Sequence, residues 1–164
     1  ITNLHGDSTS MIIIVKDALA ITSEDCILLV QPTQPLRRKE HLIDALRLLT
    51  TEPCPDSVVS LVQVPVRYHP LYQISTHMQD TPPRRIFRRC LGNLVDFPAR
   101  RQDLEAEPTY IRDGTVYAFW RKTVEQYGNI YGKIGIPLII PSDETCPLDT
   151  LEDWAEAERR LLTV

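Results

Sequence analysis

Glycine is scarce in this sequence, with six in 164 residues, and the common phosphate-binding loops are missing. Neither G-x-x-x-x-G-K-[ST] nor a G-x-G-x-x-G after a strand occurs, and these are the loops whose backbone N–H groups cradle phosphates. The four cysteines, Cys26, Cys54, Cys90 and Cys146, include no C-x-x-C pair, which argues against a cysteine zinc site. We therefore expect reduced thiols in a cytoplasmic protein.

Long apolar runs and an excess of one charge are missing as well. No stretch approaches the roughly 20 apolar residues that a membrane-spanning helix requires. The 18 Lys and Arg residues against 22 Asp and Glu residues give a net charge of −4, without the concentrated basic surface of a nucleic-acid binder. The length suits one compact domain over residues 1–164. We expect this domain to bind neither membranes nor nucleic acid.

Helices and strands alternate in the first half of the chain. Ser10 can cap a helix that extends to about Ile21, and a continuous apolar run, 26–30, indicates a buried strand. Helical spacing of leucines predicts a second helix at 39–49, and 57–64 predicts a second strand. This alternation predicts an α/β fold with a mainly parallel sheet and helices on both faces.

The second half is less regular. Residues 77–108 are polar, basic and proline-rich, so they could form a flexible loop, a linker or an arm ordered by a partner. Beyond this stretch we expect a strand at 115–120, a short helix at 121–127 and an edge strand at 136–140, because Pro137 cannot donate to a neighbouring strand. Thr150 and Asp153 have the spacing of a capping box for a last helix with an apolar stripe.

Three places could carry chemistry. The loop from Gln31 to Arg37 follows a buried strand, where ligands bind in open α/β sheets, although it could be an ordinary strand-to-helix turn. Asp149 precedes the last helix and could hold Mg²⁺, or could only interact with the helix dipole. Several cations surround Asp113-Gly114, which could be a simple hairpin turn. They are Arg100, Arg101, Arg112 and Lys122.

Five motifs in order link these features to one family. Residues 29–37, Leu-Val-Gln-Pro-Thr-Gln-Pro-Leu-Arg, resemble the L-x-Q-P-T-S-P-L-R motif of acylneuraminate cytidylyltransferases, the CMP-sialic acid synthetases. Residues 6–10 resemble S-D-T-A-S, and 69–71 match H-P-L. Residues 101–117 resemble R-Q-x-L…Y-R-x-N-G-A-I-Y, and 148–158 match I-D-T-x-x-D-W-x-x-A-E. The resemblance extends over nearly the whole chain.

This resemblance implies a fold, an activity and a set of site residues. The fold is a Rossmann-like nucleotide-diphospho-sugar transferase fold, here amino-terminally truncated and with a protruding arm, at about 77–108, that contributes to a homodimer. The activity is transfer of CMP from CTP to a nonulosonic acid, with Mg²⁺ as cofactor. The implied site residues are Asp149 (metal, catalysis), Arg101 (catalysis, sugar acid), Gln31 and Arg37 (sugar acid), and Asp7, Ser10 and Asp113 (nucleotide).

The chain also departs from the family pattern. No counterpart of the basic A-R-x-G-S-K loop, which contacts the triphosphate, is present in the sequence. Pro147 stands where the family often has a first metal aspartate, and Tyr72 replaces a lysine that often follows H-P-L. We therefore expect weak or no activity from this chain alone. Two alternatives stay open, a non-catalytic binding or dimerisation module and a transferase for the eight-carbon sugar acid of lipopolysaccharide.

Overall fold

The computed structural model describes residues 9–78, 85–89, 102, 104 and 108–162. The chain divides into two compact units. One combines Ile1–Leu61 with Arg112–Val164, and the other is Val62–Ile111. Asp7, Arg101 and much of the predicted arm at 77–108 lie outside the described residues. No helix within the described ranges is long and apolar enough to cross a bilayer.

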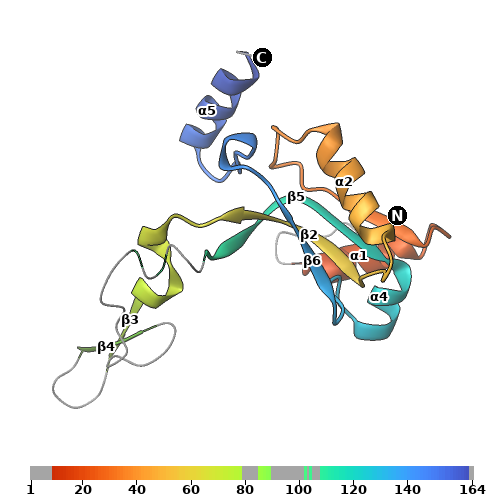
Figure 1. Ribbon diagram of the computed structural model, residues 1–164, viewed down its shortest axis with the longest axis horizontal. Helices are drawn as coiled ribbons and strands as arrows, with labels where there is room; N and C mark the ends of the chain where they lie inside the picture. Colours follow the sequence, from red (N-terminus) through yellow and green to blue (C-terminus); the bar gives the residue numbers. More distant parts are fainter. Residues whose placement is uncertain (1–8, 79–84, 90–101, 103, 105–107, 163–164) are drawn as a thin grey trace. The chain divides into compact units, whose positions relative to one another are not determined.

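A four-stranded sheet forms the centre of the first unit (Figure 1). Its strands lie in the order β1 (Cys26–Leu29), β5 (Tyr110–Trp120), β2 (Ser57–Gln63) and β6 (Gly135–Ile139). The strand β1 pairs with β5 in the antiparallel direction, whereas β2 and β6 are parallel. The predicted α/β fold is confirmed, with the qualification that β5 makes the sheet mixed. The predicted edge position of the strand with Pro137 is also confirmed.

Helices cover both faces of this sheet. Successive side chains of β5 point to opposite faces, so each face of the strand contributes residues to a separate hydrophobic cluster. Tyr117 and Phe119 pack with Val15 and Leu19 of α1 (Met11–Leu19) and with Val124 of α4 (Arg121–Tyr127). Val116 and Ala118 pack on the other side against Ala45 and Leu49 of α2 (Lys39–Thr50). The three helices coincide with the predicted ones to within two residues.

The last helix, α5 (Leu151–Leu161), begins as the sequence predicts. Thr150 Oγ1 accepts from Asp153 N at 3.2 Å, and Asp153 Oδ2 accepts from Thr150 N at 2.7 Å. Its predicted apolar stripe, however, is buried only at Ala157, and Trp154 is 55% exposed. The inner face is polar, and Arg160 Nη1 donates to Thr145 O at 3.2 Å.

The second unit begins where β2 ends. Two short 3₁₀ helices, η1 (Val66–Tyr68) and η2 (Pro70–Tyr72), precede β3 (Ile74–Met78), which pairs with β4 (Arg85–Arg89) in the antiparallel direction. His69 is extended, as its place before a proline predicts, and its Nδ1 accepts from Leu71 N at 3.2 Å. The β3–β4 pair was not predicted, because these strands are short and rich in polar and basic residues.

A carboxylate fixes the connection that leads into β6. Asp56 Oδ2 accepts from Lys133 N at 2.7 Å and from Ile134 N at 2.9 Å, and Asp56 N donates to Ile134 O at 2.8 Å. These backbone donors lower the pKa of Asp56 below its ordinary value of 3.8. The carboxylate thereby aligns β6 with the start of β2.

This arrangement predicts a loss of stability in acid. A group with a lowered folded-state pKa stabilises the fold above its unfolded pKa, and that contribution disappears as the pH falls through the folded pKa. The contribution of Asp56 should therefore be present at pH 7 and decline below about pH 4. Urea denaturation at pH 7 and pH 3 should show a smaller difference for Asp56→Asn than for wild type. Asp25→Asn, at an exposed position immediately before β1, should keep the wild-type difference.

Candidate functional site

Arg37 fixes the conformation of the loop that follows β1 through hydrogen bonds to two backbone carbonyls. Its Nε donates to Thr115 O at 2.7 Å, and its Nη2 donates to the carbonyl of Gln31. Burial lowers the pKa of this guanidinium, and the Asp113 carboxylate opposes that shift. The guanidinium stays charged, because arginine is not deprotonated in proteins. Two of the donors of Arg37 are therefore committed to the backbone, which fixes the loop against β5.

The turn at Asp113-Gly114 meets this loop. Gln34 Nε2 donates to the carbonyl of Asp113, and Gly114 adopts a φ of 80° directly beside Gln31. A Cβ on Gly114 would overlap Gln31 Oε1, so only glycine allows this approach without strain. The Asp113 carboxylate accepts from Thr115 N at 3.1 Å and from Thr115 Oγ1 at 2.6 Å. The structure thus brings Gln31, Arg37 and Asp113 together.

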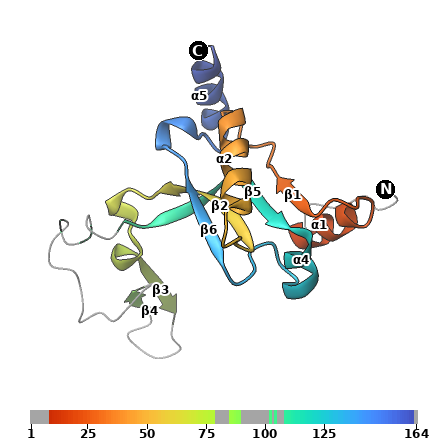
Figure 2. The ribbon, with the colours of Figure 1, turned by 45° about the vertical axis from the view of Figure 1, so that its right-hand side comes forward.

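A third segment, between β6 and α5, packs on the same loop. Leu148 N donates to Thr33 O at 3.0 Å, and Thr145 Oγ1 donates to Gln34 Oε1 at 3.2 Å. Figure 2 shows this segment turning back toward the start of α2 before α5 begins. Asp149 follows Leu148 directly, so its backbone is anchored beside the loop after β1.

The carboxylate of Asp149 is exposed and makes no hydrogen bond or ion pair within the described part of the chain. The neighbouring Asp153 is committed, because its Oδ2 accepts from Asp149 N, Thr150 N and Thr150 Oγ1. These bonds lower the pKa of Asp153. The capping of α5 is therefore supplied by Thr150 and Asp153, which leaves the Asp149 oxygens available to a ligand.

No group of three or more His, Cys, Asp or Glu side chains that could hold a metal ion is present among the described residues. Magnesium is usually bound through one or two carboxylates together with substrate phosphates, and it keeps several waters. Asp149 fits that kind of site, in which a nucleotide completes the coordination. It does not form a metal cage by itself.

The described contacts of Ser10 are local to α1. It is the exposed residue before α1, where its carbonyl accepts from Ile13 N at 3.0 Å and its hydroxyl makes no capping bond. Asp7 and Arg101 both lie outside the described residues. The predicted roles of Ser10, Asp7 and Arg101 therefore remain predictions.

One histidine differs from its predicted position. The helical pattern suggested that His41 lies on the surface, but it is only 6% exposed. Its Nδ1 accepts from Arg38 N at 3.3 Å, so Nε2 carries the proton and donates to Glu144 Oε2 at 2.9 Å. Arg38 Nη1 also reaches Glu144, at 3.0 Å. This pairing with the segment before α5, 103 residues away, could not be read from helical spacing.

The structure also reveals contacts that the sequence motifs did not predict. Gln34 is 2% exposed and Thr145 is 8% exposed, and the two are bonded to each other. Ser60 is buried in β2, and its Oγ accepts from Val116 N at 2.9 Å. Thr115 and Ser60 support the strand that carries the turn. In the sequence, these residues are marked only as polar side chains within a predicted strand or a proline-containing loop, and that feature does not identify a bonding partner.

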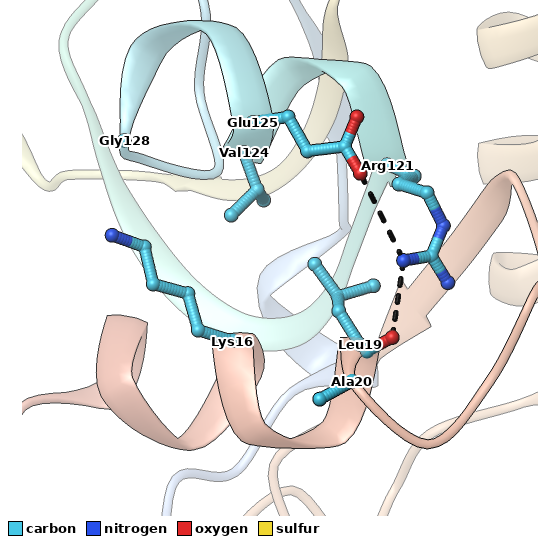
Figure 3. Close-up of a pocket in the computed structure, with 7 residues that line it drawn as sticks. All are labelled: Lys16, Leu19, Ala20, Arg121, Val124, Glu125 and Gly128. Atoms are coloured by element: carbon cyan, nitrogen blue, oxygen red, sulfur yellow. Dashed lines mark hydrogen bonds and ion pairs between the residues drawn. The ribbon is translucent and has the colours of Figure 1, made fainter.

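A separate pocket of about 370 Å³ lies between α1 and α4 (Figure 3). Arg121 reaches across it, with Nη1 donating to Leu19 O at 3.0 Å and lying 3.9 Å from Glu125 Oε1. The guanidinium also donates to the carbonyls of Thr22 and Glu24. Arg121 therefore joins the end of α1 to α4. None of the predicted site residues lines this pocket.

Comparisons with known proteins agree with the motifs. No protein-family model matches the chain. The CMP-N,N'-diacetyllegionaminic acid synthase of Legionella pneumophila is 31% identical over 140 residues, which cover 82% of this chain and 53% of the relative. The chain thus spans about half the length of that protein.

A solved structure shows the same fold. The structure of CMP:2-keto-3-deoxy-manno-octonic acid synthetase complexed with CTP matches 96% of this chain and 69% of its own chain, with a TM-score of 0.59 and 13% identity. This match supports the α/β nucleotidyltransferase fold. The sequence relationship to the legionaminic acid synthase, together with this fold, supports a CMP-nonulosonic acid cytidylyltransferase family for the chain.

Proposed function

We propose that this protein contributes to the transfer of CMP from CTP to a nonulosonic acid. The observation that supports this most directly is the meeting of three segments after β1. The loop at 31–37, the turn at Asp113-Gly114 and the segment before α5 are joined by hydrogen bonds between Gln34, Asp113, Thr145 and Thr33. An exposed carboxylate, Asp149, lies next to this junction.

In the proposed reaction, the anomeric hydroxyl of the sugar acid attacks the α-phosphorus of CTP. A new O–P bond forms, the bond from the α-phosphorus to the pyrophosphate oxygen breaks with release of pyrophosphate, and the hydroxyl proton passes to solvent. Such transfers depend mainly on positioning and on stabilisation of negative charge. A Mg²⁺ ion bound with the nucleotide would supply part of that stabilisation, and Asp149 would be its protein ligand.

The chain's own residues would orient the sugar acid and the nucleotide relative to each other. The Gln31 amide, which lies over Gly114, would donate to the sugar acid together with Arg101. Asp113, Asp7 and Ser10 would lie near the nucleotide. Arg37, which was expected to bind the sugar acid, would act at least partly by holding the Gln31 carbonyl and the strand at Thr115. The expected cytoplasmic location accompanies this proposal and remains a prediction.

The test is pyrophosphate release from CTP with a panel of nonulosonic acids and the eight-carbon sugar acid, on this chain and on any longer form. A CMP-linked sugar acid, identified by mass, should form only when both substrates are present. We expect this chain alone to be slow, because each missing preorganised contact to the transition state costs on the order of 10²–10³ in rate. Absence of CMP transfer from every form would instead favour a binding or dimerisation module.

We also propose a homodimer that uses the second unit. A two-stranded sheet such as β3–β4 is marginally stable by itself, and exposed apolar side chains such as Tyr68 and Ile74 lie in the same unit. Sedimentation at micromolar concentration should show a dimer. Ile74→Asp should shift it toward monomer, whereas Ile43→Asp, at a comparably exposed site on α2, should not. A monomeric wild-type protein would contradict the proposal.

A further inference from the structure

Gln34 makes contacts that no other residue of its loop makes. It is 2% exposed, and its side-chain amide bonds to two segments that are distant in the sequence. Its Nε2 donates to the carbonyl of Asp113, 79 residues away, and its Oε1 accepts from Thr145 Oγ1, 111 residues away. Its own backbone is tied into the loop, since Gln34 N donates to Gln31 O at 3.3 Å.

These partners require a side chain that both donates and accepts. The Asp113 carbonyl can only accept, so a donor must face it; the Gln34 N–H supplies this donor, and the Thr145 hydroxyl then donates to the amide oxygen. A serine at this position would be too short to reach both partners. A leucine would fill the space but would leave a buried carbonyl and a buried hydroxyl unpaired, which costs more than the bonds themselves contribute.

The two partners of Gln34 belong to the other two segments of the candidate site, the turn at Asp113-Gly114 and the segment before α5. Asp113 is followed by Gly114, against which the Gln31 amide lies. Thr145 begins the segment that is anchored by Leu148 N on Thr33 O, immediately before Asp149. The Asp113 carboxylate cannot replace this link, because it is already bonded to Thr115 N and Oγ1.

We propose that Gln34 is a positioning residue that fixes Asp149 relative to Gln31 without touching either substrate. The role in catalysis rests on the proposed cytidylyltransferase function, whereas the link between the segments does not. Loss of the Gln34 amide should therefore release the segment before α5 from the loop after β1, whatever reaction the protein performs.

Amide hydrogen exchange tests the link directly on the intact chain. In Gln34→Leu, exchange at Leu148 N should be at least about tenfold faster, because two buried hydrogen bonds are lost. Exchange at Ile134 N, which donates to Asp56 in another part of the unit, should be unchanged. Gln126→Leu, the same replacement on the exposed surface of α4, should alter neither rate. Unchanged exchange at Leu148 in Gln34→Leu would overturn the proposal.

Two further variants keep the test decisive if Gln34→Leu fails to fold. Thr145→Val removes only the hydroxyl donor and should accelerate exchange at Leu148 to a smaller degree. Gln34→Glu keeps the shape but turns a carboxylate toward the Asp113 carbonyl. Its effect should diminish as the pH falls, because the protonated carboxyl can donate to that carbonyl. A pH-independent defect in Gln34→Glu, or no change in Thr145→Val, would count against the link.

The catalytic part of the proposal has its own readout. In a form of the protein that transfers CMP, Gln34→Leu should raise the Mg²⁺ concentration needed for half-maximal rate, since Asp149 is held less firmly, and Gln126→Leu should not. If exchange at Leu148 accelerates but no form transfers CMP, the positioning role stands and the proposed function fails. If the Mg²⁺ dependence of Gln34→Leu equals that of wild type, the role of Gln34 in catalysis is wrong.

Discussion

Replacement of Gly132 by alanine is expected to lower the free energy of unfolding by about 2–4 kcal/mol. Gly132 has a φ of 70°, a backbone conformation that residues with a Cβ rarely adopt. A Cβ there would also lie within 2.6 Å of Asp56 Cγ. Asp56 cannot move away without loss of its bonds to Lys133 N and Ile134 N, which align β6. The backbone strain and the steric overlap should therefore add.

Gly128→Ala is the matched control for this prediction. Gly128 ends α4 with a φ of 67°, but a Cβ there would meet no atom within 4 Å. Only the cost of the left-handed backbone remains, about 1–2 kcal/mol. Urea denaturation of both variants and wild type separates the two contributions. Equal losses for Gly132→Ala and Gly128→Ala would mean that the Asp56 contact adds nothing.

The sequence predicted the elements whose packing depends on local pattern. A continuous apolar run identified β1, an apolar-rich run identified β2, and the spacing of leucines identified α2, because these elements contribute residues to one hydrophobic core. The strand β1 is only half-buried, however, whereas the sequence predicted a buried strand. The spacing of Thr150 and Asp153 predicted the start of α5 correctly. The β3–β4 pair was missed, since neither strand carries the apolar alternation on which recognition of a strand depends.

The candidate site was predictable only in part, for a physical reason. Motifs selected Gln31, Arg37, Asp113 and Asp149, and the structure brings the first three together. What each side chain bonds to depends on partners far away in sequence, such as Gln34 with Thr145. For the same reason, the pattern could not show that two Arg37 donors are committed to the backbone.

The direction of α5 illustrates the same limit. Its sequence has an apolar stripe beside a charged face, and amphipathic helices ordinarily bury the apolar side. Here Trp154 and Leu161 are 55% and 52% exposed, whereas Arg160 faces inward and donates to Thr145 O. The capping box and this arginine fix the helix orientation against the segment before it, and that orientation positions the exposed Asp149.

Asp149→Asn is expected to reduce the rate of CMP transfer by at least about 10²-fold, in any form of the protein that turns over, while the fold stays intact. An amide keeps the size of the side chain but is a poor ligand for Mg²⁺, and Pro147 leaves no second aspartate at the position where the family often has one. The rate should be measured at several Mg²⁺ concentrations, together with the free energy of unfolding.

A structural role for Asp149 would give a different result. If its carboxylate only interacted with the dipole of α5, Asp149→Asn would cost about 0.3–1 kcal/mol of stability and leave the rate unchanged. The capping bonds argue against this role, because Thr150 and Asp153 already satisfy the start of α5. Glu152→Gln removes a comparably exposed charge from the first turn of the same helix and should leave the rate at the wild-type value. A normal rate in Asp149→Asn would show that this carboxylate is not the metal ligand.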